Sequence, residues 1–144
     1  MTKFGVYVHW PFCRSKCPYC DFVSIPKRDF DESEWLTAFD NSLKHHAGKT
    51  GERTVSSVFF GGGTPSLMSG ESIRSVIETI RKYYNVDEKS EISLEGNPCS
   101  LDLEKMKAFR RAGVNRLSVG VQSLNDSDLT FLGRTHSVEQ ALTV

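Results

Sequence analysis

Apolar residues recur along the chain with two different periods, and each period predicts a different kind of element. Short runs rich in β-branched and aromatic residues predict four strands, at residues 4–9, 55–60, 91–95 and 116–123. Between the strands, apolar residues at helical spacing predict three helices, with inward-facing positions at Leu36, Phe39, Leu43 and Ala47, at Ile73, Val76, Ile77, Ile80 and Tyr84, and at Leu103, Met106 and Phe109. This alternation indicates an α/β fold.

Capping residues set the expected ends of two of these helices. Asp31 and Glu34 form a capping-box pattern that opens the first helix, and Gly48 is expected to end it. Ser100 is expected to open the third helix, and Gly113 to end it.

Short connections between strands and helices predict right-handed βαβ units and a parallel sheet. About four βα units are present, whereas a closed eightfold barrel takes roughly 250 residues, so we expect a partial (β/α) barrel. Ser137 and Gln140 open one more helix only a few residues before Val144. We therefore expect residues 1–144 to be the N-terminal portion of a longer domain.

Composition narrows the classes of function. Lysine plus arginine and aspartate plus glutamate number 18 each, so the chain has no basic field to attract nucleic acid. No apolar run approaches the roughly 18 residues of a membrane span, and the N-terminus does not resemble a secretion signal. We therefore predict a cytoplasmic location, where clustered thiols stay reduced and serve metals or catalysis.

Three cysteines with the spacing C-x3-C-x2-C follow the first strand, at Cys13, Cys17 and Cys20. Thiolates at this spacing can converge on one metal centre. Zinc is one interpretation, and it needs a fourth ligand that Cys99 or His9 would supply. An electron-transfer cluster normally uses four cysteines, whereas three cysteines fit a 4Fe–4S cluster with one open iron. We favour the cluster.

The carboxyl ends of parallel strands gather chemistry at one rim of the sheet. Gly62, Gly63 and Thr64 follow the second strand with little side-chain bulk, so backbone can approach a ligand closely there. We expect valine at position 63 to block such a ligand and to leave the metal centre in place. A plain strand-to-helix turn is the alternative reading of this GGGTP segment.

Three polar residues complete the expected rim. Glu95 ends an otherwise apolar strand, and it could bind a ligand or form a salt bridge with a neighbouring cation. Gln122 is expected to end the fourth strand and offers both a donor and an acceptor. Arg134 could grip a carboxylate with two parallel hydrogen bonds, or be solvated at the surface.

The cysteine spacing and the aromatic-rich loop around it resemble the radical S-adenosylmethionine (SAM) superfamily. Within it, the segments YVHWPFCRSKCPYCDF, FFGGGTPS, LEGNP, NRLSVGVQS and LGRTH together resemble the anaerobic coproporphyrinogen III oxidases and the HemW-type haem chaperones. The resemblance implies a partial (β/α) barrel of the radical SAM type. It also implies a 4Fe–4S cluster whose open iron chelates the methionine moiety of SAM, and SAM-contacting positions at Tyr7, Tyr19, Gly62, Gly63, Thr64, Glu95, Gln122 and Arg134.

Phe22 separates the two branches of this group. The oxidases carry a further cysteine two residues after the third cluster cysteine, whereas this chain has CDF at residues 20–22, as the haem chaperones do. The resemblance therefore favours a chaperone that binds haem and delivers it to apoproteins. The alternative is an oxidase that converts porphyrinogen propionates to vinyl groups with SAM and an electron donor such as flavodoxin or ferredoxin. A radical enzyme acting on transfer RNA is a distant third.

Overall fold

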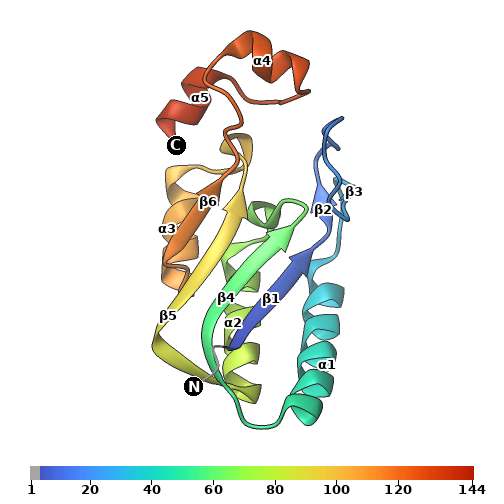
Figure 1. The fold of residues 1–144 in the computed structure, drawn as a ribbon, viewed down its shortest axis with the longest axis vertical. Helices are drawn as coiled ribbons and strands as arrows, with labels where there is room; N and C mark the ends of the chain where they lie inside the picture. The colour runs from blue at the N-terminus through green and yellow to red at the C-terminus, as the bar shows by residue number, and fades with distance from the viewer. Residues whose placement is uncertain (1–3) are drawn as a thin grey trace.

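The computed structural model describes residues 4–144 and contains a four-stranded parallel sheet in the order β1-β4-β5-β6 (Figure 1). The four strands are β1 (Phe4–Trp10), β4 (Thr54–Gly62), β5 (Asn85–Gly96) and β6 (Arg116–Val119). All four predicted strands are present, and the parallel order confirms the α/β prediction. The fourth strand is shorter than expected, because it ends at Val119 rather than Ser123.

Three helices connect these strands: α1 (Glu32–Thr50), α2 (Gly70–Tyr83) and α3 (Leu103–Ala112). They stand side by side along the sheet, with α2 between α1 and α3 (Figure 1). Their apolar residues pack against alternate residues of the strands, such as Val58, Ile92 and Leu94, to form the core. The opposite face of the sheet, called the polar face below, carries Glu91, Ser93 and Glu95, together with the stacked rings of Tyr7 and Phe59.

The structure corrects two predicted helix ends. Helix α1 continues through Gly48, because one glycine costs a helix only about 1 kcal/mol. It ends at Thr50, and the next residue, Gly51, has a φ of 66° that is not helical. Helix α3 begins after Asp102, whose side chain accepts from the Lys105 amide, and not at Ser100. Leu103 is 63% exposed, so it is not one of the inward-facing positions.

Ser100 lies in a short 3-10 helix, η2 (Pro98–Ser100), that follows β5, and a similar turn, η1 (Pro65–Leu67), follows β4. The C-terminal part of the chain forms α4 (Asp126–Phe131) and α5 (Val138–Thr143), and Ser137 and Gln140 make the expected capping box of α5. Helix α4 was not predicted. Figure 1 shows both helices beyond the carboxyl ends of the strands.

The cysteine-rich loop is closed by two very short parallel strands, β2 (Phe12–Cys13) and β3 (Ile25–Pro26). A cluster of four aromatic rings anchors its base, with ring centroids 5.0–5.8 Å apart, made by Trp10, Phe12, Phe30 and Trp35. Trp10 and Phe12 are buried in the main core. The loop is therefore attached firmly to the carboxyl end of β1.

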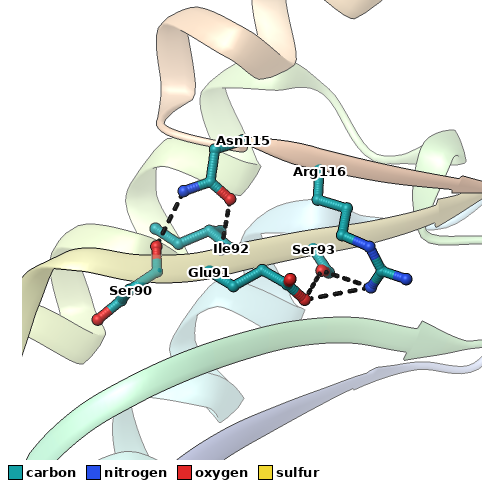
Figure 2. Close-up of polar contacts among 6 residues, drawn as sticks. All are labelled: Ser90, Glu91, Ile92, Ser93, Asn115 and Arg116. Atoms are coloured by element: carbon teal, nitrogen blue, oxygen red, sulfur yellow. Dashed lines mark hydrogen bonds and ion pairs between the residues drawn. The ribbon is translucent and has the colours of Figure 1, made fainter.

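Asn115 holds the start of β6 against β5 (Figure 2). Its amide oxygen accepts from the Ile92 backbone N–H at 2.8 Å, and its amide nitrogen donates to the Ser90 carbonyl at 2.9 Å. One side chain therefore satisfies two backbone groups of β5 where β6 begins.

Arg116, the next residue, is directed to the polar face of the sheet (Figure 2). Its Nη1 donates to the Glu91 carboxylate at 3.1 Å and to the Ser93 hydroxyl at 3.2 Å. Because the Ser93 hydroxyl also donates to Glu91, these three side chains fix the register of β6 beside β5.

Among the helices of residues 4–144, none has the length and apolarity that crossing a membrane would take.

Candidate cofactor site

A cavity of about 280 Å³ lies between the cysteine-rich loop and the carboxyl ends of β4, β5 and β6. Nine of the eleven residues predicted for the site line it: Cys13, Cys17, Tyr19, Cys20, Gly63, Thr64, Glu95, Gln122 and Arg134. Tyr7 and Gly62 lie outside its lining. The structure therefore gathers residues from five separate segments of the chain. Four of these segments lie at the carboxyl ends of strands, as predicted, and the fifth, which carries Arg134, follows α4.

The three loop cysteines are free thiols that line this cavity together. Within residues 4–144, no three potential ligands are gathered tightly enough to hold a single metal ion. A 4Fe–4S cluster makes a different demand, because each thiolate binds its own iron atom and the cysteines surround a volume. Three thiols around a cavity, with oxygen and nitrogen donors on the facing wall, suit such a cluster.

Neither candidate for a fourth zinc ligand joins the three cysteines. Both ring nitrogens of His9 are engaged, Nδ1 with the Tyr7 hydroxyl at 3.1 Å and Nε2 with the Val23 carbonyl at 2.9 Å. Cys99 contacts the Thr135 hydroxyl at 3.4 Å and does not line the cavity.

Gly63 and Gly62 allow neighbouring protein groups, and not only a ligand, to approach the chain closely. A Cβ on Gly63 would lie 2.6 Å from the Phe12 carbonyl oxygen and 2.7 Å from that of Pro11, so any side chain would push the loop backbone away. We therefore predict that valine at position 63 disturbs the cysteine-rich loop as well, in place of the expectation that the metal centre would be left as it is. At Gly62 the φ is 108°, and a Cβ would meet the His9 ring at 2.6 Å.

Glu95 points from β5 into the cavity and makes no salt bridge among the described residues. Burial raises the pKa of its carboxyl group, although a hydrogen bond from the Gly62 backbone opposes the shift. Tyr7, on the polar face of β1, has a raised pKa because of burial and because of the Glu95 charge. The salt-bridge reading of Glu95 is therefore wrong for this structure, and the carboxylate stays available to a ligand.

Arg134 approaches the cavity from the segment between α4 and α5. Its Nη2 donates to the Asn97 side chain at 2.7 Å and to the Gly120 carbonyl at 2.9 Å. Its Nη1 donates to Cys17 Sγ at 3.4 Å and to the Tyr19 hydroxyl at 3.3 Å. Protein acceptors thus occupy the fork that the sequence assigned to a carboxylate, and only the buried Nε lacks a partner within residues 4–144.

Gln122 lies three residues beyond the end of β6, not at the end of the strand. Two tight turns bring it there, in which Val121 N–H bonds to the Val119 carbonyl and Ser123 N–H bonds to the Val121 carbonyl. Its φ of 73° is unusual for a residue other than glycine. A strained backbone at a cavity wall is typical of a functional position.

One residue at this site has a role that the sequence did not single out. Asn97 lines the cavity and contacts Arg134, although only Glu95 was singled out in the LEGNP segment. The sequence contains a signal for this role, because an amide side chain directly after the carboxyl end of a strand lies on the same rim. Phe22 also lines the cavity beside the cysteines, and 62% of its surface is exposed.

Comparison with known proteins agrees with this geometry. A family model for the "Radical SAM superfamily" matches residues 7–144. Radical S-adenosyl methionine domain-containing protein 1, mitochondrial, of Bos taurus is 44% identical over 96% of this chain and 31% of its own length. Heme chaperone HemW of Haemophilus influenzae is 40% identical over 98% of this chain and 38% of its own length.

Among solved structures, coproporphyrinogen III oxidase (HemN) from Escherichia coli superposes with a TM-score of 0.87 at 30% identity. The match covers 96% of this chain and 32% of the oxidase. The chain therefore spans about a third of the length of the relatives that it matches.

Proposed function

Because the chain belongs to the radical SAM superfamily, we propose that Cys13, Cys17 and Cys20 hold a 4Fe–4S cluster and that S-adenosylmethionine binds in the adjoining cavity. The observation that carries this proposal is the common lining of the cavity by the three thiols and by the residues of the strand ends. When bound, the two cofactors supply one-electron radical chemistry that amino-acid side chains cannot provide.

The residues of the chain would bind and orient S-adenosylmethionine. The Glu95 carboxylate, whose pKa is raised by burial, gains most from a cationic partner such as an amino group. Gln122 offers an amide to a hydroxyl group, and Arg134 places a positive charge at the cavity wall. Gly63 and Thr64 line the same cavity.

For the whole protein we propose a haem chaperone of the HemW type. The identity of 40% to a HemW, against 30% to the oxidase, supports this branch. Phe22 supports it as well, because it lines the cavity where the resemblance gives the oxidases a further cysteine. Haem, and the apoproteins that would receive it, are therefore the proposed ligand and partners.

The alternative is an oxygen-independent coproporphyrinogen III oxidase, favoured by the TM-score of 0.87 to such an enzyme. This alternative would require an external electron donor such as flavodoxin or ferredoxin.

The cytoplasmic location is also still a prediction, since the name of one relative assigns that relative to mitochondria.

One experiment separates the two functions. The whole protein, with its cluster reconstituted, is titrated with haem and is incubated anaerobically with coproporphyrinogen III, S-adenosylmethionine and a reductant. We expect haem binding, and no carbon dioxide release from the porphyrinogen. Phe22→Cys should not create the oxidase, since substrate placement depends on more than one residue. Release of carbon dioxide by the wild type would establish the enzyme and refute the chaperone.

A further inference from the structure

Two of the three loop cysteines accept hydrogen bonds from the facing wall of the cavity. The Thr64 hydroxyl donates to Cys13 Sγ at 3.2 Å, and Arg134 Nη1 donates to Cys17 Sγ at 3.4 Å. The donors come from different parts of the chain, Thr64 from the turn after β4 and Arg134 from the segment after α4. A third group that contacts both donors is therefore needed to position them together.

Asn97 links the two donors. Arg134 Nη2 donates to the Asn97 amide oxygen at 2.7 Å, and the Asn97 amide nitrogen donates to the Thr64 hydroxyl oxygen over a longer 3.5 Å. A guanidinium can only donate, so the amide oxygen of Asn97 must face Arg134 and its NH₂ group must face Thr64. The Thr64 hydroxyl then accepts from Asn97, and its single proton is left for Cys13.

The three residues of this link have little freedom to rearrange. Thr64 is 4% exposed. The Asn97 backbone N–H donates to the Ser100 hydroxyl at 3.3 Å, which holds Asn97 at the start of η2. Arg134 is fixed a second time by the Gly120 carbonyl at 2.9 Å. The fold thus sets the direction of each hydrogen bond that links Arg134, Asn97, Thr64 and Cys13.

We propose that Asn97 is a positioning residue that directs Thr64 and Arg134 onto the sulfur atoms of two cluster ligands, and that this arrangement raises the reduction potential of the cluster. Hydrogen bonds to the sulfurs and a nearby positive charge stabilise the more negative, reduced form of an iron–sulfur cluster. The inference rests on the cluster of the proposed function. It adds a role for three side chains before any S-adenosylmethionine binds.

The first test removes one donor and keeps its shape. In Thr64→Val the Cys13 sulfur loses its hydrogen bond, so the ratio of reduced to oxidised cluster at a fixed potential should fall about fivefold, or about 40 mV for a one-electron couple. Thr135→Val is the matched control, because it removes the same kind of hydroxyl–sulfur contact from Cys99, which is not a cluster ligand in this proposal. The control should leave the midpoint potential unchanged.

The second test reverses the direction of the hydrogen bond between Asn97 and Thr64. In Asn97→Asp the carboxylate can only accept, so it takes the Thr64 proton away from Cys13 and also adds a negative charge. We expect a more negative midpoint potential than in Thr64→Val. When Thr64→Val is already present, Asn97→Asp should shift the potential by less than it does alone, because only the charge effect is left.

Potentials are measured by redox titration of the reconstituted protein without S-adenosylmethionine, after iron and sulfide have been counted. If Thr64→Val loses its cluster, Thr64→Ser keeps the hydroxyl and should keep the wild-type potential. The iron–sulfur stretching bands of the wild type should also move on exchange into D₂O, and those bands should move less in Asn97→Asp. Equal potentials in wild type, Thr64→Val and Asn97→Asp would overturn this inference alone. A wild type that takes up no cluster would overturn the proposed function with it.

Discussion

Replacing Gly63 by alanine should damage the protein far more than the size of one methyl group suggests. The added Cβ would lie 2.6 Å and 2.7 Å from the carbonyl oxygens of Phe12 and Pro11. Both neighbours are backbone atoms, which cannot rotate out of the way as a side chain can. The segment that carries Cys13 would therefore have to move.

The expected cost follows from the contacts that this movement breaks. Overpacking by one methyl group costs about 1–3 kcal/mol. Movement of the loop also weakens two backbone hydrogen bonds, from Gly63 N–H to the Trp10 carbonyl at 2.6 Å and from Thr64 N–H to the Phe12 carbonyl at 2.8 Å, each worth about 1 kcal/mol. Gly63→Ala should thus lower the free energy of unfolding by about 3–5 kcal/mol, a large share of the 5–15 kcal/mol of an ordinary protein.

Urea unfolding of the cluster-free protein measures this cost, and iron uptake after reconstitution measures the damage to the cysteine-rich loop. Gly48→Ala is the control, because Gly48 lies inside α1 with no atom within 4 Å of its added Cβ. That variant should gain about 0.5–1 kcal/mol from the better helix former. If Gly63→Ala unfolds like the wild type and takes up a full complement of iron, the close approach described here is wrong.

Three further predictions test other parts of the structure. Replacement of each loop cysteine by serine, at Cys13, Cys17 or Cys20, should abolish iron and sulfide uptake, whereas Cys99→Ser should retain both. Burial raises the pKa of Glu95, so the folded protein binds the carboxyl proton of Glu95 more tightly than the unfolded chain does. The free energy of unfolding therefore falls as the pH rises above the pKa of an ordinary glutamate. Glu95→Gln should therefore resist urea better than the wild type at pH 7 but not at pH 4, and equal gains at both would contradict the shift. Asn115→Ala should cost about 1–3 kcal/mol in urea unfolding, because it leaves two backbone groups of β5 unpaired. Asn85→Ala, which loses only an exposed 3.5 Å contact, should change little.

The strands and the rim were predictable because they depend on local composition. A run such as VSSVFF forms a strand wherever it can be covered, and parallel strands joined by helices bring their carboxyl ends to one edge. The cysteine spacing placed Cys13, Cys17 and Cys20 in a loop at that edge, and the structure agrees.

The ends of the elements were less predictable, because neighbours in space decide them. Ser100 and Asp102 are both residue types that favour the N-terminal cap of a helix. Pro98 begins the short helix η2, which contains Ser100, and Asp102 then caps α3. Strand β6 pairs with β5 only as far as Val119, since β5 ends at Gly96. Gln122 consequently reaches the cavity by two tight turns and a φ of 73°, which no local sequence pattern announces.

The assignment of acceptors to Arg134 was beyond any sequence argument. A free arginine beside a cofactor site has five donors, and the expectation of a bidentate grip assumes that two parallel ones are free. Here one nitrogen is shared by Asn97 and Gly120, and the other by Cys17 and Tyr19. These acceptors lie 14 to 117 positions away in sequence, so only the folded chain brings them together. The same fold that fills the fork of Arg134 also directs one of its N–H groups to the Cys17 sulfur, so protein acceptors hold both Nη atoms of Arg134 before any ligand binds.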